Sequence, residues 1–120
     1  MPHLTLEYTR NLAGFDPRQA LAAVNEAMFD SGLFGEPDIK SRAIGLDCYQ
    51  VGVQSGGRGF VHICIAMLSG RSSEERKQLA DAVLAALSAA VNAEPGMEIQ
   101  LSVETVDLDR PSYAKALIHG

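Results

Sequence analysis

Residues 60–91 read FVHICIAMLSGRSSEERKQLADAVLAALSAAV, and this segment decides the fold because it joins a strand pattern directly to a helix pattern. Phe60 to Leu68 is an almost continuous apolar run, typical of a central strand buried on both faces. Ser72-Ser73-Glu74-Glu75 then forms a capping box, which marks the start of a helix. Apolar side chains recur behind it at helical spacing, at Leu79, Ala82, Val83, Ala86, Leu87, Ala90 and Val91.

A further strand is expected after this helix. Pro95-Gly96 ends the helical pattern, and apolar and polar side chains then alternate from Met97 to Val106. Such alternation is typical of a strand with one face exposed. The second half of the chain therefore has the order β-α-β.

The first half of the chain repeats this order. Apolar and polar side chains alternate up to Tyr8, which predicts a first strand that begins at Pro2. Asp16-Pro17-Arg18-Gln19 predicts a helix start, with Asp16 as N-cap and Gln19 able to complete a capping box, and Ser31-Gly32 ends the helix. Residues 39–51 then read as a second strand, followed by a glycine-rich connection at 55–57.

Two β-α-β halves predict an α+β fold. Each half needs a right-handed crossover that makes its two strands parallel, and together the halves give a four-stranded mixed sheet with both helices on one face. We expect one domain over residues 1–120, with halves of about 1–56 and 57–120. The other sheet face is left uncovered, and a second subunit is the expected cover. A monomeric ferredoxin-like sandwich has the same element order and stays open.

Composition excludes several classes of function. Apolar residues make up 47% and charged residues 21%, as in a globular protein, and the formal net charge is -5. The basic residues are scattered singly, which argues against a nucleic-acid partner. No segment is long and apolar enough for a membrane span, and Met1 to Arg10 lacks the features of a signal peptide, so we expect a cytoplasmic protein. Cys48 and Cys64 lack metal-ligand spacing and are predicted to be reduced sheet residues, and no metal or nucleotide cofactor is implied.

The Met1-Pro2 start offers one candidate catalytic group. A small second residue usually allows the methionine to be removed, which leaves Pro2 as a free secondary amine. An α-amino group titrates near roughly pH 8, and burial or a neighbouring cation lowers its pKa. Pro2 could therefore act as a general base, although Met-Pro starts are common in proteins without such chemistry.

Three basic residues are candidates for binding an anion. Arg71 follows Ser69-Gly70 at the expected helix N-terminus, where a guanidinium and backbone N–H groups can hold a carboxylate together. Lys40 and Arg42 are two residues apart in a strand and so share one sheet face. The alternatives are a solvated loop arginine for Arg71 and a charged strand start that protects a sheet edge for Lys40 and Arg42.

Several of these features occur together in one chain, namely Pro2 behind Met1, the doubled β-α-β order, Ile39-Lys40-Ser41-Arg42, Phe60-Val61-His62 and Ser69-Gly70-Arg71-Ser72. With this order and spacing the chain resembles the 5-carboxymethyl-2-hydroxymuconate delta-isomerase family of the tautomerase superfamily, from Met1 to the Asp109-Arg110-Pro111 region. The resemblance implies a homotrimer whose three sheets form a barrel with the helices outside. It also implies an isomerase that uses no cofactor and converts a dienol to its conjugated keto isomer.

The resemblance assigns roles to individual residues. Pro2 matches the catalytic base and later acid, and Arg71 matches the arginine that binds and polarises the acid groups of the substrate. A basic strand residue of the family falls on Lys40 or Arg42, and relatives tend to have arginine at the first of these positions. Lysine keeps the charge but loses the bidentate fork. The implied substrate is a small dicarboxylic acid of the 5-carboxymethyl-2-hydroxymuconate type, from aromatic catabolism.

Two other functions stay open at this point. One is a tautomerase of a different enol, such as an aryl pyruvate, which would have no use for an anchor for a second carboxylate. The other is a non-catalytic module that binds a small ligand, because a fold alone does not fix a function. The residue types favour the isomerase, since the reaction needs a base poised near neutral pH, a cation facing the developing oxyanion and an anchor for the distal carboxylate.

Overall fold

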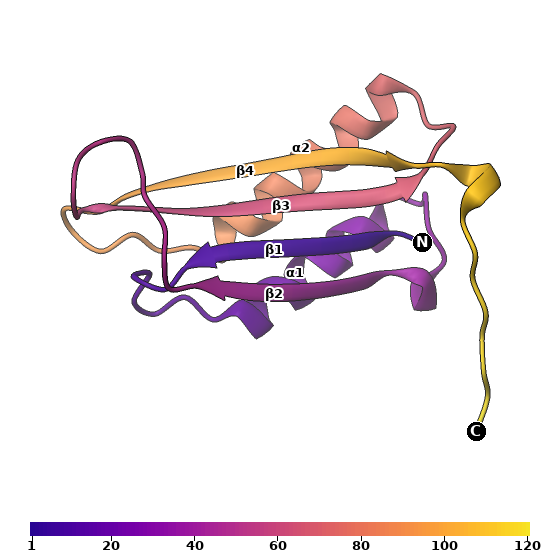
Figure 1. Ribbon diagram of the computed structural model, residues 1–120, viewed down its shortest axis with the longest axis horizontal. Helices are drawn as coiled ribbons and strands as arrows, with labels where there is room; N and C mark the ends of the chain where they lie inside the picture. The colour runs from indigo at the N-terminus through magenta and orange to yellow at the C-terminus, as the bar shows by residue number, and fades with distance from the viewer.

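Two helices cover one face of a four-stranded sheet in the computed structural model of residues 1–120 (Figure 1). The strands are β1 (His3–Thr9), β2 (Lys40–Leu46), β3 (Arg58–Leu68) and β4 (Glu98–Leu108). The helices are α1 (Pro17–Asp30) and α2 (Ser73–Ala89), with single 3-10 turns at η1 (Glu36–Asp38) and η2 (Arg110–Ser112). Neither helix has the length and apolar character needed to cross a membrane.

The strand order is β2-β1-β3-β4, which the sequence pattern left undetermined. β1 and β2 are parallel, β3 and β4 are parallel, and the two halves meet where β1 pairs antiparallel with β3. The predicted doubled β-α-β fold is confirmed. The ferredoxin-like alternative is wrong, because the two strands of each unit are direct neighbours here, whereas a split β-α-β unit has another strand between them.

The core lies between the sheet and the helices. Every second residue of β3 is fully buried there, and α1 and α2 each contribute an apolar stripe; its members include Leu4, Leu6, Val24, Met28, Val61, Ile63, Ile65, Met67, Leu79, Val83 and Leu87. Asp16 caps α1 by accepting from the backbone N–H groups of Arg18 and Gln19. The predicted capping box of α2 is present between Ser72 and Glu75.

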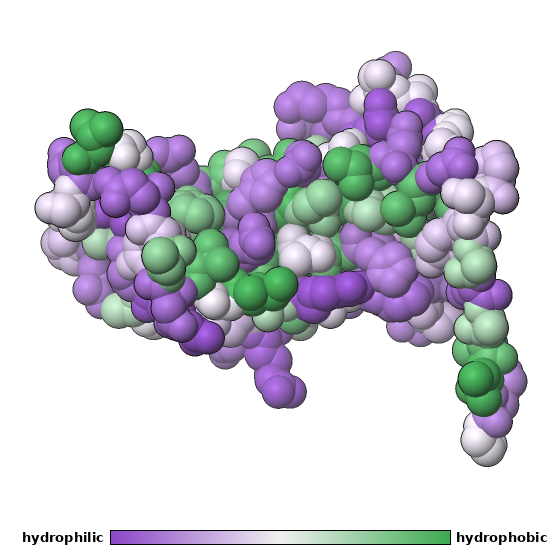
Figure 2. Space-filling model, in the orientation of Figure 1, coloured by the Kyte–Doolittle hydropathy of each residue, from purple (hydrophilic) through white to green (hydrophobic).

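The opposite sheet face, which we call the open face, differs from the prediction for β3. Residues of β3 on this face are half-buried, so the strand is not buried on both faces within a single chain. The register places Ile44 and Val106 on this face, with 46% and 36% of their surfaces exposed. Figure 2 shows the open face as a mixture of apolar and polar areas. The apolar run of β3 therefore includes residues on a face that a single chain leaves uncovered.

The second strand of the first half is shorter than predicted. β2 ends at Leu46, whereas the sequence favoured a strand over residues 39–51. Beyond Leu46 the chain forms an exposed loop, in which Gly52, Gly56 and Gly57 adopt positive φ angles. Glycine adopts such angles without steric cost, and they lie outside the range of a regular strand. Cys48 consequently lies in this loop and is exposed rather than part of a strand, while Cys64 lies in β3, and both are free thiols.

Candidate active site

The sheet topology brings four separate segments together at one end of the molecule. Because β1 and β3 are antiparallel, the N-terminus lies beside the end of β3, and because β3 and β4 are parallel, the segment after β4 reaches the same end (Figure 1). The loop between α1 and β2 completes the group. A pocket of about 460 Å³ lies between them, lined by Met1, Leu33, Phe34, Gly35, Asp38, Met67, Leu68, Arg71, Arg110, Tyr113 and Lys115. This volume lies in the range of small-molecule sites.

Met1, which carries the N-terminal amine, lines this pocket. With Met1 in place, burial lowers the pKa of the amine below its ordinary value, and the neighbouring Lys40 and Lys115 lower it further, against a smaller opposite effect of Asp38. Pro2 is buried directly behind Met1, and its carbonyl accepts from the backbone N–H of Lys40 at 3.2 Å. An amine at this end of β1 therefore lies in surroundings that favour its neutral form.

Arg71 is fixed at the rim of the pocket by two contacts. It follows Gly70, whose φ of 118° allows the chain to turn sharply between β3 and α2. Its guanidinium donates to the Leu33 carbonyl at 2.8 Å and lies 5.4 Å from the centre of the Phe34 ring. Arg71 forms no ion pair, so its charge is available to an anionic ligand.

Glu75, in the first turn of α2, does not neutralise Arg71. Its carboxylate accepts from the backbone N–H of Ser72 at 3.0 Å, as part of the capping box. The hydrogen bonds with Ser72 are the main reason that the pKa of Glu75 is lowered, and the positive charge of Arg71 adds to this effect. The carboxylate is thus held as part of the helix cap.

Lys40 and Arg42 make different contacts in the structure. Both lie on one sheet face, as predicted; this is the open face, and the parallel register pairs them with His3 and Thr5. The Lys40 ammonium donates to the Asp38 carbonyl and lowers the pKa of the nearby N-terminal amine. Arg42 instead donates to Nδ1 of His3 at 2.7 Å and is exposed. Neither side chain lines the pocket, but only Lys40 acts on the amine.

The surroundings of His3 at the same end of the sheet lower its pKa and so favour the neutral ring. Burial lowers its pKa, and the positive charges of Arg42 and Lys40 lower it further. Because Arg42 donates to Nδ1, the proton of the neutral ring is on Nε2, which lies 3.3 Å from the hydroxyl of Tyr113. His3 therefore connects the open face to Tyr113, which lines the pocket.

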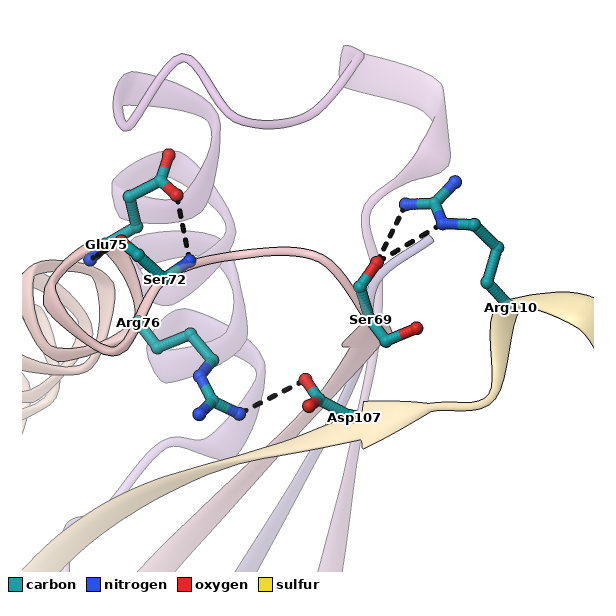
Figure 3. A network of polar contacts seen from close by, with 6 residues as sticks. All are labelled: Ser69, Ser72, Glu75, Arg76, Asp107 and Arg110. Carbon is teal, nitrogen blue, oxygen red and sulfur yellow. Dashed lines mark hydrogen bonds and ion pairs between the residues drawn. The ribbon is translucent and has the colours of Figure 1, made fainter.

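The sequence patterns missed the C-terminal wall, which is formed by Arg110, Tyr113 and Lys115. Arg110 donates through Nε and a terminal nitrogen to the Ser69 carbonyl, at 3.2 and 3.0 Å (Figure 3). Lys115 pairs with Asp38 at 3.1 Å, and this contact lowers the pKa of Asp38. These residues follow the last strand, and only the strand order shows that they return to the end of β3.

No cluster of three or more side chains suited to metal binding occurs in the chain. The described arrangement is a doubled β-α-β sheet with a cationic pocket around its N-terminal amine. This combination defines the class of the protein as a tautomerase-type fold.

The chain matches the family model of 5-carboxymethyl-2-hydroxymuconate isomerase over residues 2–120. It belongs to this family, as its sequence motifs indicated, and is an isomerase. The alternative of a non-catalytic binding module is therefore wrong. A search of curated protein sequences found no match.

Solved structures agree with this assignment. The chain is similar to a 5-carboxymethyl-2-hydroxymuconate isomerase from Deinococcus radiodurans R1, with 31% identity, a TM-score of 0.87, and coverage of 96% of this chain and 88% of that one. A 5-carboxymethyl-2-hydroxymuconate delta-isomerase shares the fold at 18% identity and a TM-score of 0.72, over 100% and 89% of the two chains. A fused 4-OT wild-type symmetric trimer does so at 16% identity and a TM-score of 0.76, over 95% and 91%.

Proposed function

We propose that the chain, after removal of Met1, isomerises an unsaturated 2-hydroxy diacid of the 5-carboxymethyl-2-hydroxymuconate type to its conjugated keto form. The observation that carries this proposal is the pocket itself, which combines a terminal amine of lowered pKa with two arginines that have no carboxylate partner. The family match begins at residue 2, so the matched region starts with the proposed base.

In the proposed reaction the neutral amine of Pro2 takes the proton of the substrate hydroxyl. The oxygen then forms the new carbonyl, the double bonds shift along the chain, and the Pro2 ammonium returns the proton to a distal carbon. Arg71 faces the charge that develops on oxygen and polarises the acid group next to it. Acid–base help of this kind accelerates a reaction by on the order of a hundred- to ten-thousandfold.

Burial and two nearby cations, Lys115 in the pocket lining and Lys40 beside it, prepare Pro2 for this role. Lys40 and Lys115 lower the pKa of an amine at this position, since positive charges disfavour an ammonium. A larger fraction of the amine is then neutral at a given pH. Asp38 acts in the opposite direction, but its pairing with Lys115 offsets that effect.

The wild-type protein is expected to prefer a diacid. We expect its kcat/KM to be about tenfold or more higher for a 2-hydroxymuconate-type dienol than for the enol of an aryl pyruvate, because a second carboxylate gains a charge-assisted contact. Ultraviolet absorbance follows both reactions. A preference for the aryl pyruvate enol would instead support the alternative tautomerase.

We further propose that three copies of the chain assemble into a homotrimer through their open faces. The half-buried face of β3 and the exposed Ile44 and Val106 support a second protein surface as the cover. The fused 4-OT structures with this fold are described as trimers. Sedimentation equilibrium should give about three times the 12.8 kDa of the single chain, and a mass of 12.8 kDa would contradict the proposal.

A further inference from the structure

We propose that Arg110 is a second carboxylate-binding residue, which forms with Arg71 a two-guanidinium site selective for dianionic ligands. The inference rests on the proposed function in one respect, namely that this pocket is the substrate site. It assigns the anchor for the distal carboxylate to η2, a segment that the sequence patterns did not single out.

Both arginines are positioned by the turn that follows β3. Arg71 is part of this turn and donates to the Leu33 carbonyl, while Arg110 comes from the other side and donates twice to the carbonyl of Ser69. Figure 3 shows Arg110 reaching from the end of β4 to Ser69, with its third nitrogen free of any drawn contact. Bonds to neutral carbonyls fix the two guanidinium planes without neutralising their charges.

The charges in the pocket match a dianion. Lys115 is paired with Asp38, so these two charges offset each other. Arg71 and Arg110 form no ion pair with any carboxylate of the chain. When the terminal amine is neutral, as a general base must be, two uncompensated positive charges line the pocket. Two carboxylates on one ligand would balance them.

Arg42 is less suited to this role, although the sequence offered it, together with Lys40, as a candidate. Its side chain lies on the open face, donates to His3 and contributes no atom to the pocket lining. Arg110 lines the pocket and lies across the same turn as Arg71. A guanidinium also offers the bidentate fork that Lys40 lacks. Within one chain, Arg110 is thus the arginine placed to take the second carboxylate.

Binding of two unreactive acids tests the inference. Adipate carries two carboxylates and hexanoate carries one on a chain of the same length, and calorimetry measures the Kd of each. We expect the wild-type protein to bind adipate about tenfold or more tightly than hexanoate. In Arg110→Ala this preference should disappear through weaker adipate binding, because one carboxylate still meets Arg71. Arg110→Lys should recover part of it.

Arg10→Ala is the matched control, since Arg10 is an arginine at the opposite end of β1 that pairs with Asp47. It should keep the wild-type preference for adipate. An undiminished preference in Arg110→Ala, an equal loss for both acids, or no preference in the wild type would each overturn the inference. Because neither acid reacts, these outcomes are separate from the dienol assay. A lost preference in Arg110→Ala together with an inactive wild type would reject the isomerisation but support the dianion site.

Discussion

Protein that retains Met1 is expected to isomerise a dienol diacid at least about 100-fold more slowly than protein that begins at Pro2. Met1 moves the terminal nitrogen by one residue, which is about 3.8 Å along the chain. A misplacement of about 1 Å can already cost on the order of 100-fold in rate. The Met1 side chain also lines the pocket and so takes up space that a substrate would need.

The comparison needs both forms in pure state, and intact mass distinguishes them. Pro2→Ala without Met1 is the control, because it keeps an amine at the same place and should lose less activity than the Met1 form. The pH profile gives a second readout. Burial, Lys40 and Lys115 lower the pKa of an amine at this position, so kcat/KM should rise with pH through a pKa below the ordinary value of roughly 8. Equal rates for the two forms would reject Pro2 as the base.

Most of the fold follows from local patterns in the sequence. The capping box at Ser72 and Glu75, the apolar stripe of α2 and the alternation of β4 each have one dominant physical cause, and the structure confirms all three. The end of β2 was wrong because alternation continues for several residues past Leu46, while the glycines that bend the chain lie further on. The open face of β3 has a different cause: the apolar run of this strand includes residues on a face that a single chain leaves half-buried.

The candidate site could be predicted only in part. Pro2 and Arg71 belong to motifs that can be recognised in a sequence, whereas Arg110 and Lys115 are single basic residues beyond the last strand. What brings them to the pocket is the strand order, and long-range pairing leaves no local signature in a sequence. The different contacts of Lys40 and Arg42 could likewise not be predicted from the sequence. A shared sheet face does not determine which side chain turns toward the terminal amine.

Arg71→Ala is expected to lower kcat/KM by about 100- to 1,000-fold, as the removal of a donor from an oxyanion site does. The substitution also removes one hydrogen bond to Leu33 and the contact with Phe34. These losses should reduce the free energy of unfolding by only about 1–2 kcal/mol, as judged from denaturant curves. Arg71→Lys keeps the charge without the bidentate fork, so its kcat/KM should lie between those of the wild type and Arg71→Ala.

Arg76→Ala separates a catalytic role of Arg71 from a structural one. Arg76 is the fourth residue of α2 and pairs with Asp107 at 3.1 Å, outside the pocket lining (Figure 3). Loss of this partly exposed pair should cost about 0.2–1 kcal/mol of stability and leave turnover within about twofold of the wild type. If Arg71→Ala and Arg76→Ala reduced turnover alike and in proportion to their loss of stability, Arg71 would be a structural residue. The expected divergence arises because Arg71 presents an uncompensated charge to the pocket, whereas Arg76 is paired with Asp107 outside it.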